Sequence, residues 1–322
     1  MTSATYVGRF APSPTGPLHF GSLVCALASF LDARHQAGRW LVRIEDIDPP
    51  REISGATTTI LRQLSDHGLT WDGELLYQST RTEAYREAIA ALQSAHIAYS
   101  CDCPRQRITS LGGIYDGYCH QRTVIENPAI RLQVPIESEA SESEASESKT
   151  IVRFDDLIMG YYLQNLSTEV GDFVIQRRDQ LFSYQLAVTV DDRFQNISHI
   201  IRGADLIDST PRQIYLQECL ESLSGEHSAP TGSPLTSSPL TYGHLPMAIN
   251  AEGQKLSKQN HAAALVAGEE SQNLWLALQW LGQQPPDQLK NESISRILDW
   301  AISNWSLNAI PKQLAMPAPS HY

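Results

Sequence analysis

The hydrophobic positions near the start of the chain change from a short apolar run to a long helical period. Tyr6 and Val7 lie in the short run, and apolar residues recur with helical spacing from Leu23 to Leu31, ahead of Gly38. The connection between the two runs contains three prolines and a glycine, namely Pro12, Pro14, Gly16 and Pro17. Because these residues disfavour a regular element, the pattern predicts a strand, a tight loop and a helix.

The next apolar run, at residues 40–44, predicts a second strand directly after this helix. A strand–helix–strand unit is the building block of a parallel sheet, so the first part of the chain is predicted to be α/β. Helical periods follow at 56–66 and 82–96, and residues 150–173 are strand-like and rich in turns.

The second half of the chain continues this alternation of short elements. Apolar runs predict strands at 182–190 and 197–201, and the first of them ends at two carboxylates. A helix is predicted at 209–220, and the Ser-, Pro-, Thr- and Gly-rich stretch 225–246 is predicted to be a loop or linker. Apolar stripes with helical spacing predict two last helices, around 274–281 and 294–305.

Composition places the chain among globular proteins. It has 322 residues, of which 42% are hydrophobic and 19% charged, enough for one large or two ordinary domains. We find neither a run of 18 apolar residues nor a basic, then apolar N-terminus, so we expect a cytoplasmic protein without a membrane partner. The five cysteines are an odd number and do not suggest a disulfide framework.

The formal net charge of −12 argues against nonspecific nucleic-acid binding by the whole surface. Part of that charge is local, because residues 137–149 hold five glutamates against one lysine in a Ser/Ala/Glu repeat. We expect this insertion to be an inert, disordered or solvated loop. Arginines nearby could still form an RNA-facing patch. They are Arg105, Arg107, Arg122, Arg131, Arg153, Arg177 and Arg178.

The Pro-rich loop delivers His19, Gly21 and Ser22 to the first turn of the predicted helix. Helix N-termini favour phosphate through their free N–H groups and the helix dipole. Gly21 has no Cβ, which would let a nucleotide lie against the backbone, and His19 can donate a hydrogen bond to a phosphate oxygen. The alternative is a Pro-rich loop that merely caps a core helix.

Charged residues also follow predicted strands. Glu45 follows the strand at 40–44, where ligands bind on parallel sheets, and its carboxylate could bind an amino group; the alternative is a surface acid. Arg202 ends the strand at 197–201 and offers a planar fork for a carboxylate, unless it only pairs with a neighbouring acid. Lys255 and Lys258 lie in a lysine-rich turn and could neutralise charge on a triphosphate.

A group of thiols marks a second candidate site. Cys101, Cys103 and Cys119 lie within nineteen positions, which suits zinc in a reducing compartment. The fourth ligand could be Tyr115 or His120, and the general preference of zinc for imidazole favours His120. The alternative is a set of core cysteines without metal.

Three stretches together resemble a known family. Arg9-Phe-Ala-Pro-Ser-Pro-Thr-Gly, followed by His19-Phe-Gly-Ser22, resembles the HIGH signature of class I aminoacyl-tRNA synthetases, in the form of their glutamyl and glutaminyl branch. Lys255-Leu-Ser-Lys258 resembles their second signature, KMSKS. The Cys-x-Cys pair with Tyr115-Asp-Gly-Tyr-Cys119 is similar to the bacterial glutamyl-queuosine tRNA(Asp) synthetases, and this similarity favours Tyr115 as the fourth zinc ligand.

The resemblance implies an α/β fold: a Rossmann-like parallel sheet with a zinc-bearing insertion and a short C-terminal helical domain. The domain boundaries expected from it, in chain order, are 1–97 for the first half of the catalytic domain, 98–180 for the insertion, 181–224 for the second half, 225–246 for the linker and 247–322 for the helical domain with the lysine loop.

The resemblance also implies roles for single residues. Those implied in catalysis are His19, Lys255 and Lys258. Those implied in glutamate binding are Arg9, Phe10, Ala11, Pro12, Ser13, Glu45, Tyr184 and Arg202. Those implied in ATP binding are His19, Gly21, Ser22 and Lys258. Those implied in holding one zinc ion are Cys101, Cys103, Tyr115 and Cys119. Mg²⁺ would accompany ATP.

The activity implied by the resemblance is activation of L-glutamate with ATP, without tRNA, and transfer to queuosine in the anticodon loop of tRNA(Asp). A queuosine-bearing anticodon stem-loop would then be the RNA partner of a monomeric enzyme. The alternatives are a shortened glutamyl-tRNA synthetase that charges the tRNA 3′ end, a nucleotidyltransferase and a silent RNA-binding paralogue. Because no stretch of this sequence after the lysine loop is long enough, we expect the anticodon-binding domain of glutamyl-tRNA synthetases to be missing, and this expectation favours transfer to queuosine over charging of the 3′ end.

Overall fold

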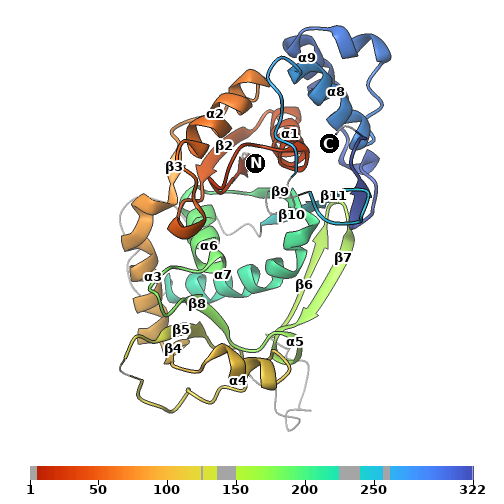
Figure 1. Ribbon diagram of the computed structural model, residues 1–322. Coiled ribbons are helices and arrows are strands. Elements are labelled where there is room, and N and C mark those ends of the chain that lie inside the picture. The colour runs from red at the N-terminus through yellow and green to blue at the C-terminus, as the bar shows by residue number, and fades with distance from the viewer. Residues whose placement is uncertain (1–5, 125, 136–149, 225–239, 257–261, 321) are drawn as a thin grey trace.

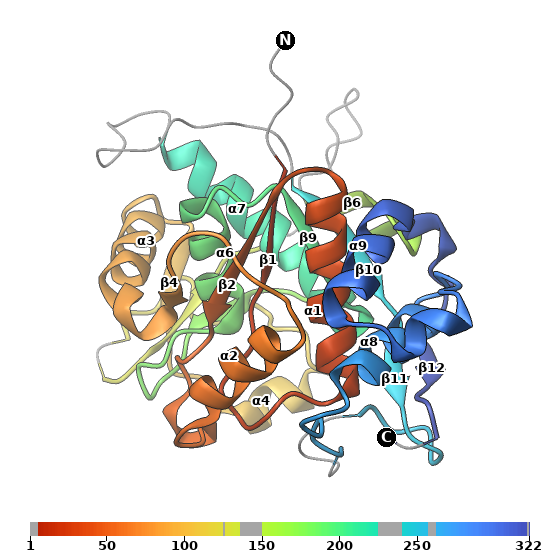
Figure 2. The ribbon, with the colours of Figure 1, turned by 90° about the horizontal axis from the view of Figure 1, so that it is seen from above.

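The computed structural model describes residues 6–124, 126–135, 150–224, 240–256, 262–320 and 322. Its central layer consists of parallel strands in two groups (Figures 1 and 2). The first group pairs in the order β1-β2-β3, and the second pairs β9 with β10. The Ser198 N–H donates to the Val7 carbonyl at 2.9 Å, which places β9 beside β1. The bounds are β1 (Val7–Phe10), β2 (Arg39–Ile44), β3 (Leu76–Tyr77), β9 (His199–Gly203) and β10 (Thr241–Leu245).

Helices cover both faces of this sheet, as Figure 2 shows. One hydrophobic cluster joins the sheet to α1 (Phe20–His35), α2 (Ala56–Asp66), α8 (Glu270–Trp280) and α9 (Ile294–Asn304). A second cluster gathers α3 (Thr82–Ser94), α6 (Tyr184–Phe194) and α7 (Thr210–Ser224). The α/β class with a parallel sheet, predicted from the sequence, is confirmed.

The insertion forms the lower part of the molecule in Figure 1. Its antiparallel sheet has the order β4-β5-β8, and a separate hairpin pairs β6 with β7. The bounds are β4 (Ala98–Cys101), α4 (Arg105–Ser110), β5 (Ala129–Leu132), β6 (Ile151–Asp156), β7 (Gly160–Asn165), α5 (Leu166–Glu169) and β8 (Phe173–Gln176).

The C-terminal part packs on α1. β11 (Met247–Ile249) pairs in parallel with β12 (Ala315–Pro317), which returns the end of the chain to the region of the lysine loop. Short 3₁₀ turns connect the main elements at Pro49–Arg51, Gln78–Arg81, Ala204–Ser209, Asp287–Asn291 and Leu307–Ala309. No helix in the described ranges is long and apolar enough to cross a bilayer.

The predicted strand at 182–190 is wrong, because these residues enter helix α6. Ser183 caps this helix: its Oγ accepts from the Leu186 N–H at 3.3 Å. The run is short and apolar, and such runs do not distinguish a strand from a buried helix by periodicity alone. The carboxylates of Asp191 and Asp192 therefore lie buried in the last turn of a helix instead of at a strand end.

The predicted linker 225–246 is wrong over its last residues, because Thr241–Leu245 forms β10 and pairs with β9. The burial pattern explains this, since Tyr242 and Leu245 are buried despite the polar residues around them. Residues 225–239 and 136–149, the latter including the Glu/Ser insertion at 137–149, lie outside the described part of the chain.

Candidate active site

The N-terminus of α1 carries His19 as its capping residue. The His19 Nδ1 accepts a hydrogen bond from the Ser22 N–H at 3.4 Å. In a neutral imidazole the proton must then be on Nε2, which makes Nε2 a donor. The predicted helix N-terminus is present in the structure, and His19 stands at it as the capping residue.

Gly21 is fitted to this histidine. A Cβ at position 21 would come within 3.2 Å of the His19 Cε1 atom and 3.3 Å of Nδ1. A side chain at position 21 would therefore press on the imidazole ring, which would have to move by a few tenths of an ångström. Gly21 leaves room for the ring in its present position, a constraint that the sequence alone did not reveal.

Both ends of the lysine loop are attached beside His19. On one side, the Leu265 N–H donates to the Leu18 carbonyl at 3.0 Å, and His19 forms an isolated bridge with Ala264. On the other, the Leu256 N–H donates to the Ala248 carbonyl at 2.7 Å. The two stretches that resemble class I signatures thus lie together, although they are far apart in sequence.

The two lysines of this loop differ in what the structure describes. The Lys255 ammonium forms an ion pair with the Asp205 carboxylate, next to the end of β9. Lys258 lies outside the described residues.

A buried group of charges lies across the ends of β1, β2 and α6. Arg43 is completely buried and donates to Asp192 at 2.7 Å, and its other Nη lies 3.5 Å from Glu45. Arg9 reaches the same Asp192 through Nε at 3.3 Å and Nη2 at 3.5 Å. Burial alone would raise the pKa of Asp192, but the guanidiniums of Arg43 and Arg9 bring it below its usual value. Burial raises the pKa of Glu45, and the same arginines only partly offset this.

Arg202 has a different environment, because no carboxylate of the described residues forms an ion pair with it. Its Nε donates to His244 Nε2 at 3.1 Å, and its Nη2 donates to Thr210 Oγ1 at 2.8 Å. Its Nη1 donates to the Tyr184 hydroxyl at 3.3 Å. The sequence left open a structural pair with a neighbouring acid; the structure instead gives this buried cation neutral partners.

Arg202, Tyr184, Glu45 and Arg9 share one electrostatic environment. Burial raises the pKa of Tyr184; Arg202 and Arg9 oppose the rise, and Glu45 adds to it. Four of the residues expected to bind glutamate are therefore brought together from β1, β2, α6 and β9.

A cavity of about 240 Å³ opens beside these side chains. Ser13, Glu45 and Tyr184, three of the residues that the resemblance implied in glutamate binding, line it. Ala11 and Pro12 are half-buried in the loop before it, and the Pro12 carbonyl accepts from the Glu45 N–H at 3.0 Å. The Phe10 side chain instead lies in the core, stacked on Trp40.

The cavity also contains residues that the sequence analysis did not assign to a glutamate site, among them Arg177, which was expected in an RNA-facing patch. Gln78 is 1% exposed, donates through Nε2 to Asp191 at 3.0 Å, and has no partner for Oε1 among the described residues. Arg51 and Arg177 line the same cavity. In the sequence these two arginines were marked only by their charge, and they come from segments that are far apart along the chain.

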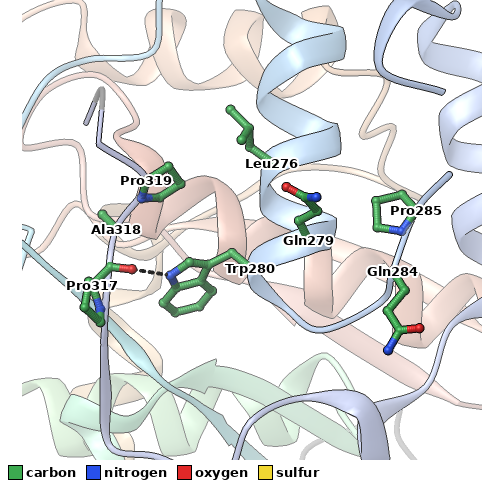
Figure 3. Close-up of a pocket in the computed structure, with 8 residues that line it drawn as sticks. All are labelled: Leu276, Gln279, Trp280, Gln284, Pro285, Pro317, Ala318 and Pro319. Carbon is green, nitrogen blue, oxygen red and sulfur yellow. Dashed lines mark hydrogen bonds between the residues drawn. The ribbon is translucent and has the colours of Figure 1, made fainter. Parts of the chain in front are cut away.

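A second cavity, of about 590 Å³, lies elsewhere in the described part of the chain (Figure 3). It is a hollow between the end of α8 and the last strand, where Trp280 Nε1 donates to the Pro317 carbonyl at 2.8 Å. Its lining has no titratable side chain, so it offers no acid–base or charge chemistry.

The insertion holds the second candidate site. The sulfurs of Cys101, Cys103 and Cys119 all lie within 4.8 Å of one another. The Tyr115 hydroxyl lies 3.5 Å from the Cys101 sulfur and 3.3 Å from the Cys103 sulfur. Sulfurs about 3.8 Å apart are what tetrahedral bonds of about 2.3 Å to zinc require, so the donor set fits this metal.

His120, the other candidate for a fourth ligand, is occupied elsewhere. Its Nε2 lies 2.6 Å from the Asp172 carboxylate, and its ring packs edge-on against Tyr99. Of the two candidates, Tyr115 is therefore the one whose donor atom lies among the sulfurs.

A histidine at a helix N-terminus, a lysine loop attached beside it and a buried charged cavity on a parallel sheet are together the arrangement of a class I synthetase-type ligase. Residues 6–278 match the family described as tRNA synthetases class I (E and Q), catalytic domain, and the chain belongs to this family.

Relatives and solved structures agree with this assignment. The chain is 47% identical over 315 residues to the glutamyl-Q tRNA(Asp) synthetase of Shigella flexneri, covering 97% of this chain and 92% of that protein. It is also 47% identical over 314 residues to the Salmonella typhimurium protein of the same name, covering 97% and 95%. A glutamate-tRNA synthetase from Elizabethkingia anophelis shares the fold, with a TM-score of 0.76 at 22% identity over 99% of this chain and 69% of that one.

Proposed function

We propose that the chain activates L-glutamate with ATP as glutamyl-adenylate and transfers the glutamate to queuosine in the anticodon loop of tRNA(Asp). The observation that carries the first step is Arg202, a buried cation that has neutral hydrogen-bond partners and contacts Tyr184 in the lining of the charged cavity. The second step is supported by the 47% identity to proteins named glutamyl-Q tRNA(Asp) synthetase.

In this proposal the cavity recognises glutamate by charge. Arg202 and Tyr184 hold the side-chain carboxylate, and Tyr184 can donate its own hydroxyl proton because it accepts from Arg202. Glu45 binds the ammonium group, and Gln78 Oε1 offers a second acceptor in the same cavity. Arg9, anchored on Asp192, together with Ala11, Pro12, Ser13 and the Phe10 backbone, shapes the rest of the pocket.

The reaction then needs positioning and charge neutralisation more than a covalent nucleophile. A glutamate α-carboxylate oxygen attacks the α-phosphorus of ATP, and pyrophosphate leaves. His19, Gly21 and Ser22 bind phosphate at the start of α1, with Lys255 and Lys258 from the loop. Mg²⁺ would accompany the ATP. A hydroxyl of the queuosine ring next attacks the acyl carbon, an ester forms, and AMP leaves.

The test of this function is the position of the label after incubation with ATP and radioactive glutamate. We expect glutamate-dependent ATP–pyrophosphate exchange without RNA, and label on an isolated anticodon stem-loop of tRNA(Asp) only when it carries queuosine. The matched control is the same stem-loop with unmodified guanosine. Label on the terminal adenosine of intact tRNA would instead support the alternative, a glutamyl-tRNA synthetase that charges the 3′ end.

We also propose that Cys101, Cys103, Tyr115 and Cys119 hold one zinc ion in a structural role, because four protein ligands leave no open position. The surroundings suit the negative charge of such a site. Arg131 Nε donates to the Cys101 sulfur at 3.3 Å, and Arg122 Nη1 donates to the Cys119 sulfur at 3.5 Å.

Metal analysis tests this site. We expect about one zinc per chain in the wild type and in His120→Ala, and clearly weaker zinc retention against a chelator in Tyr115→Phe, which loses a ligand atom. The two variants are matched, because both residues lie in the short segment 115–120 but only Tyr115 lies among the sulfurs. Zinc kept by Tyr115→Phe and lost by His120→Ala would reverse the assignment. The monomeric state and the cytoplasmic location stay predictions.

A further inference from the structure

A buried chain of three side chains leads from the hairpin β6–β7 to Arg202. Asp156 Oδ2 lies 2.6 Å from His244 Nδ1, and His244 Nε2 lies 3.1 Å from Arg202 Nε. His244 and Arg202 are direct partners in the register of β10 and β9. All three side chains are buried, and none of the sequence motifs pointed to Asp156 or His244.

The hydrogen bonds determine the proton positions on His244. Arg202 Nε always carries a proton, so His244 Nε2 must accept and the imidazole proton must lie on Nδ1, facing Asp156. The pKa values agree. Burial and Arg202 lower the pKa of His244, against the opposing effect of Asp156. The pKa of Asp156 is also lowered: burial opposes this, but His244 and backbone N–H groups outweigh it. The hydrogen-bonded series therefore consists of the Asp156 carboxylate, the neutral His244 imidazole and the Arg202 guanidinium.

We propose that Asp156 and His244 are positioning residues, which orient Arg202 so that one edge of its guanidinium faces the glutamate carboxylate. This role rests on the proposed glutamate activation. His244 takes the Nε proton, while Thr210 Oγ1 and the Leu206 carbonyl accept from Nη2 at 2.8 and 3.3 Å. The Nη1 edge is left on the side of Tyr184, which lines the cavity.

The arrangement also keeps the charge of Arg202 available. Direct contact with a carboxylate would neutralise the guanidinium and compete with the substrate. Here the negative charge of Asp156 is held one side chain away, behind a neutral imidazole. The buried cation gains a counter-charge but keeps a place for an incoming carboxylate.

Asp156→Asn is a specific probe because its amide can bind in only one orientation. Asp156 Oδ1 accepts from three backbone N–H groups, those of Ile158, Met159 and His244, at 2.8 to 3.0 Å. An asparagine must place its oxygen there, so its NH₂ group faces His244 Nδ1. That nitrogen must then accept, the proton moves to Nε2, and two N–H groups oppose each other between His244 and Arg202.

The first measurement is steady-state ATP–pyrophosphate exchange by purified wild type and Asp156→Asn. We expect the KM for glutamate to rise about tenfold to hundredfold, because the variant loses one charge-assisted hydrogen bond. The kcat and the KM for ATP should stay within about threefold of the wild-type values. Discrimination against glutamine should fall in parallel, because Arg202 recognises charge. An unchanged KM for glutamate, or an equal loss in kcat and in the KM for ATP, would overturn the positioning role.

A matched pair at His244 gives a second, independent test. In His244→Gln the amide oxygen reaches the position of Nε2 and can accept from Arg202, whereas the shorter His244→Asn reaches only toward Asp156. We expect the KM for glutamate of His244→Gln to be at least about fivefold lower than that of His244→Asn. In the His244→Gln background, Asp156→Asn should raise this KM little further, because glutamine has no tautomer to fix. Equal values for the two variants would overturn the proposal. A wild type without glutamate-dependent exchange would instead overturn the proposed function.

Discussion

Replacing Arg202 by lysine is expected to lower kcat/KM for glutamate by at least about a hundredfold, since it removes two or more hydrogen bonds to charged groups. Lysine offers a single point of charge and cannot donate to His244, Thr210 and Tyr184 at once, as the guanidinium does. Glutamate would lose its contact with the Nη1 side of the guanidinium, and His244 Nε2 would lose its donor. The measurement is glutamate-dependent pyrophosphate exchange across glutamate concentrations.

The matched control for this substitution is Arg296→Lys. Arg296 lies on α9, and its guanidinium is 69% exposed in an ion pair with Glu292. Such surface pairs contribute less than about 1 kcal/mol, so exchange should stay at the wild-type level. A wild-type kcat/KM in Arg202→Lys, with normal folding, would show that this arginine does not bind glutamate.

Local sequence patterns predicted the parts of the site that depend on local geometry. The Pro-rich loop and the following period located the N-terminus of α1 and His19, because capping is decided within one turn. The close sequence spacing of Cys101, Cys103 and Cys119 located the candidate metal site, because residues only a short segment apart can easily come together. The predicted strand end located Arg202, which lies near the end of β9.

Side-chain pairs between distant parts of the chain were not predicted, because the sequence does not indicate which charged residues contact each other. Arg43 appeared as part of an apolar strand, yet it binds Asp192, 149 residues away. His244 lay in a segment predicted to be a linker, yet it pairs with Asp156 across 88 residues. The choice between Tyr115 and His120 likewise needed the position of Asp172, which holds the histidine away from the sulfurs.

Replacing Asp192 by asparagine is expected to destabilise the fold by about 3–5 kcal/mol, the range for breaking a buried ion pair from one side. Arg43 and Arg9 would remain buried, and their charge would face a neutral amide that can accept through only one oxygen. Gln195 would still accept from Arg43 at 2.8 Å, but it carries no charge. The measurement is urea unfolding, in which the midpoint should fall while the slope stays constant.

Glu83→Gln serves as the control for this change, because it also turns a paired carboxylate into an amide. Glu83 pairs with Arg86 at 3.4 Å on the surface of α3, with side chains 74% and 62% exposed. Its loss should cost less than about 1 kcal/mol. Equal stability of Asp192→Asn and wild type would mean that the Arg9–Asp192–Arg43 group does not stabilise the fold.

The pH dependence of unfolding shows how the charge of Asp192 contributes to the free energy of unfolding. The folded state lowers the pKa of Asp192, so its stabilisation is complete above the unfolded value of about 3.9 and is lost as the pH falls through the folded pKa. Glu45 has the opposite sign, because its raised pKa means that ionisation with rising pH opposes folding. Asp192→Asn should therefore lose most stability at neutral pH and approach the wild type in acid. A constant difference across the whole range would show that the carboxylate charge of Asp192 is not what stabilises the two arginines.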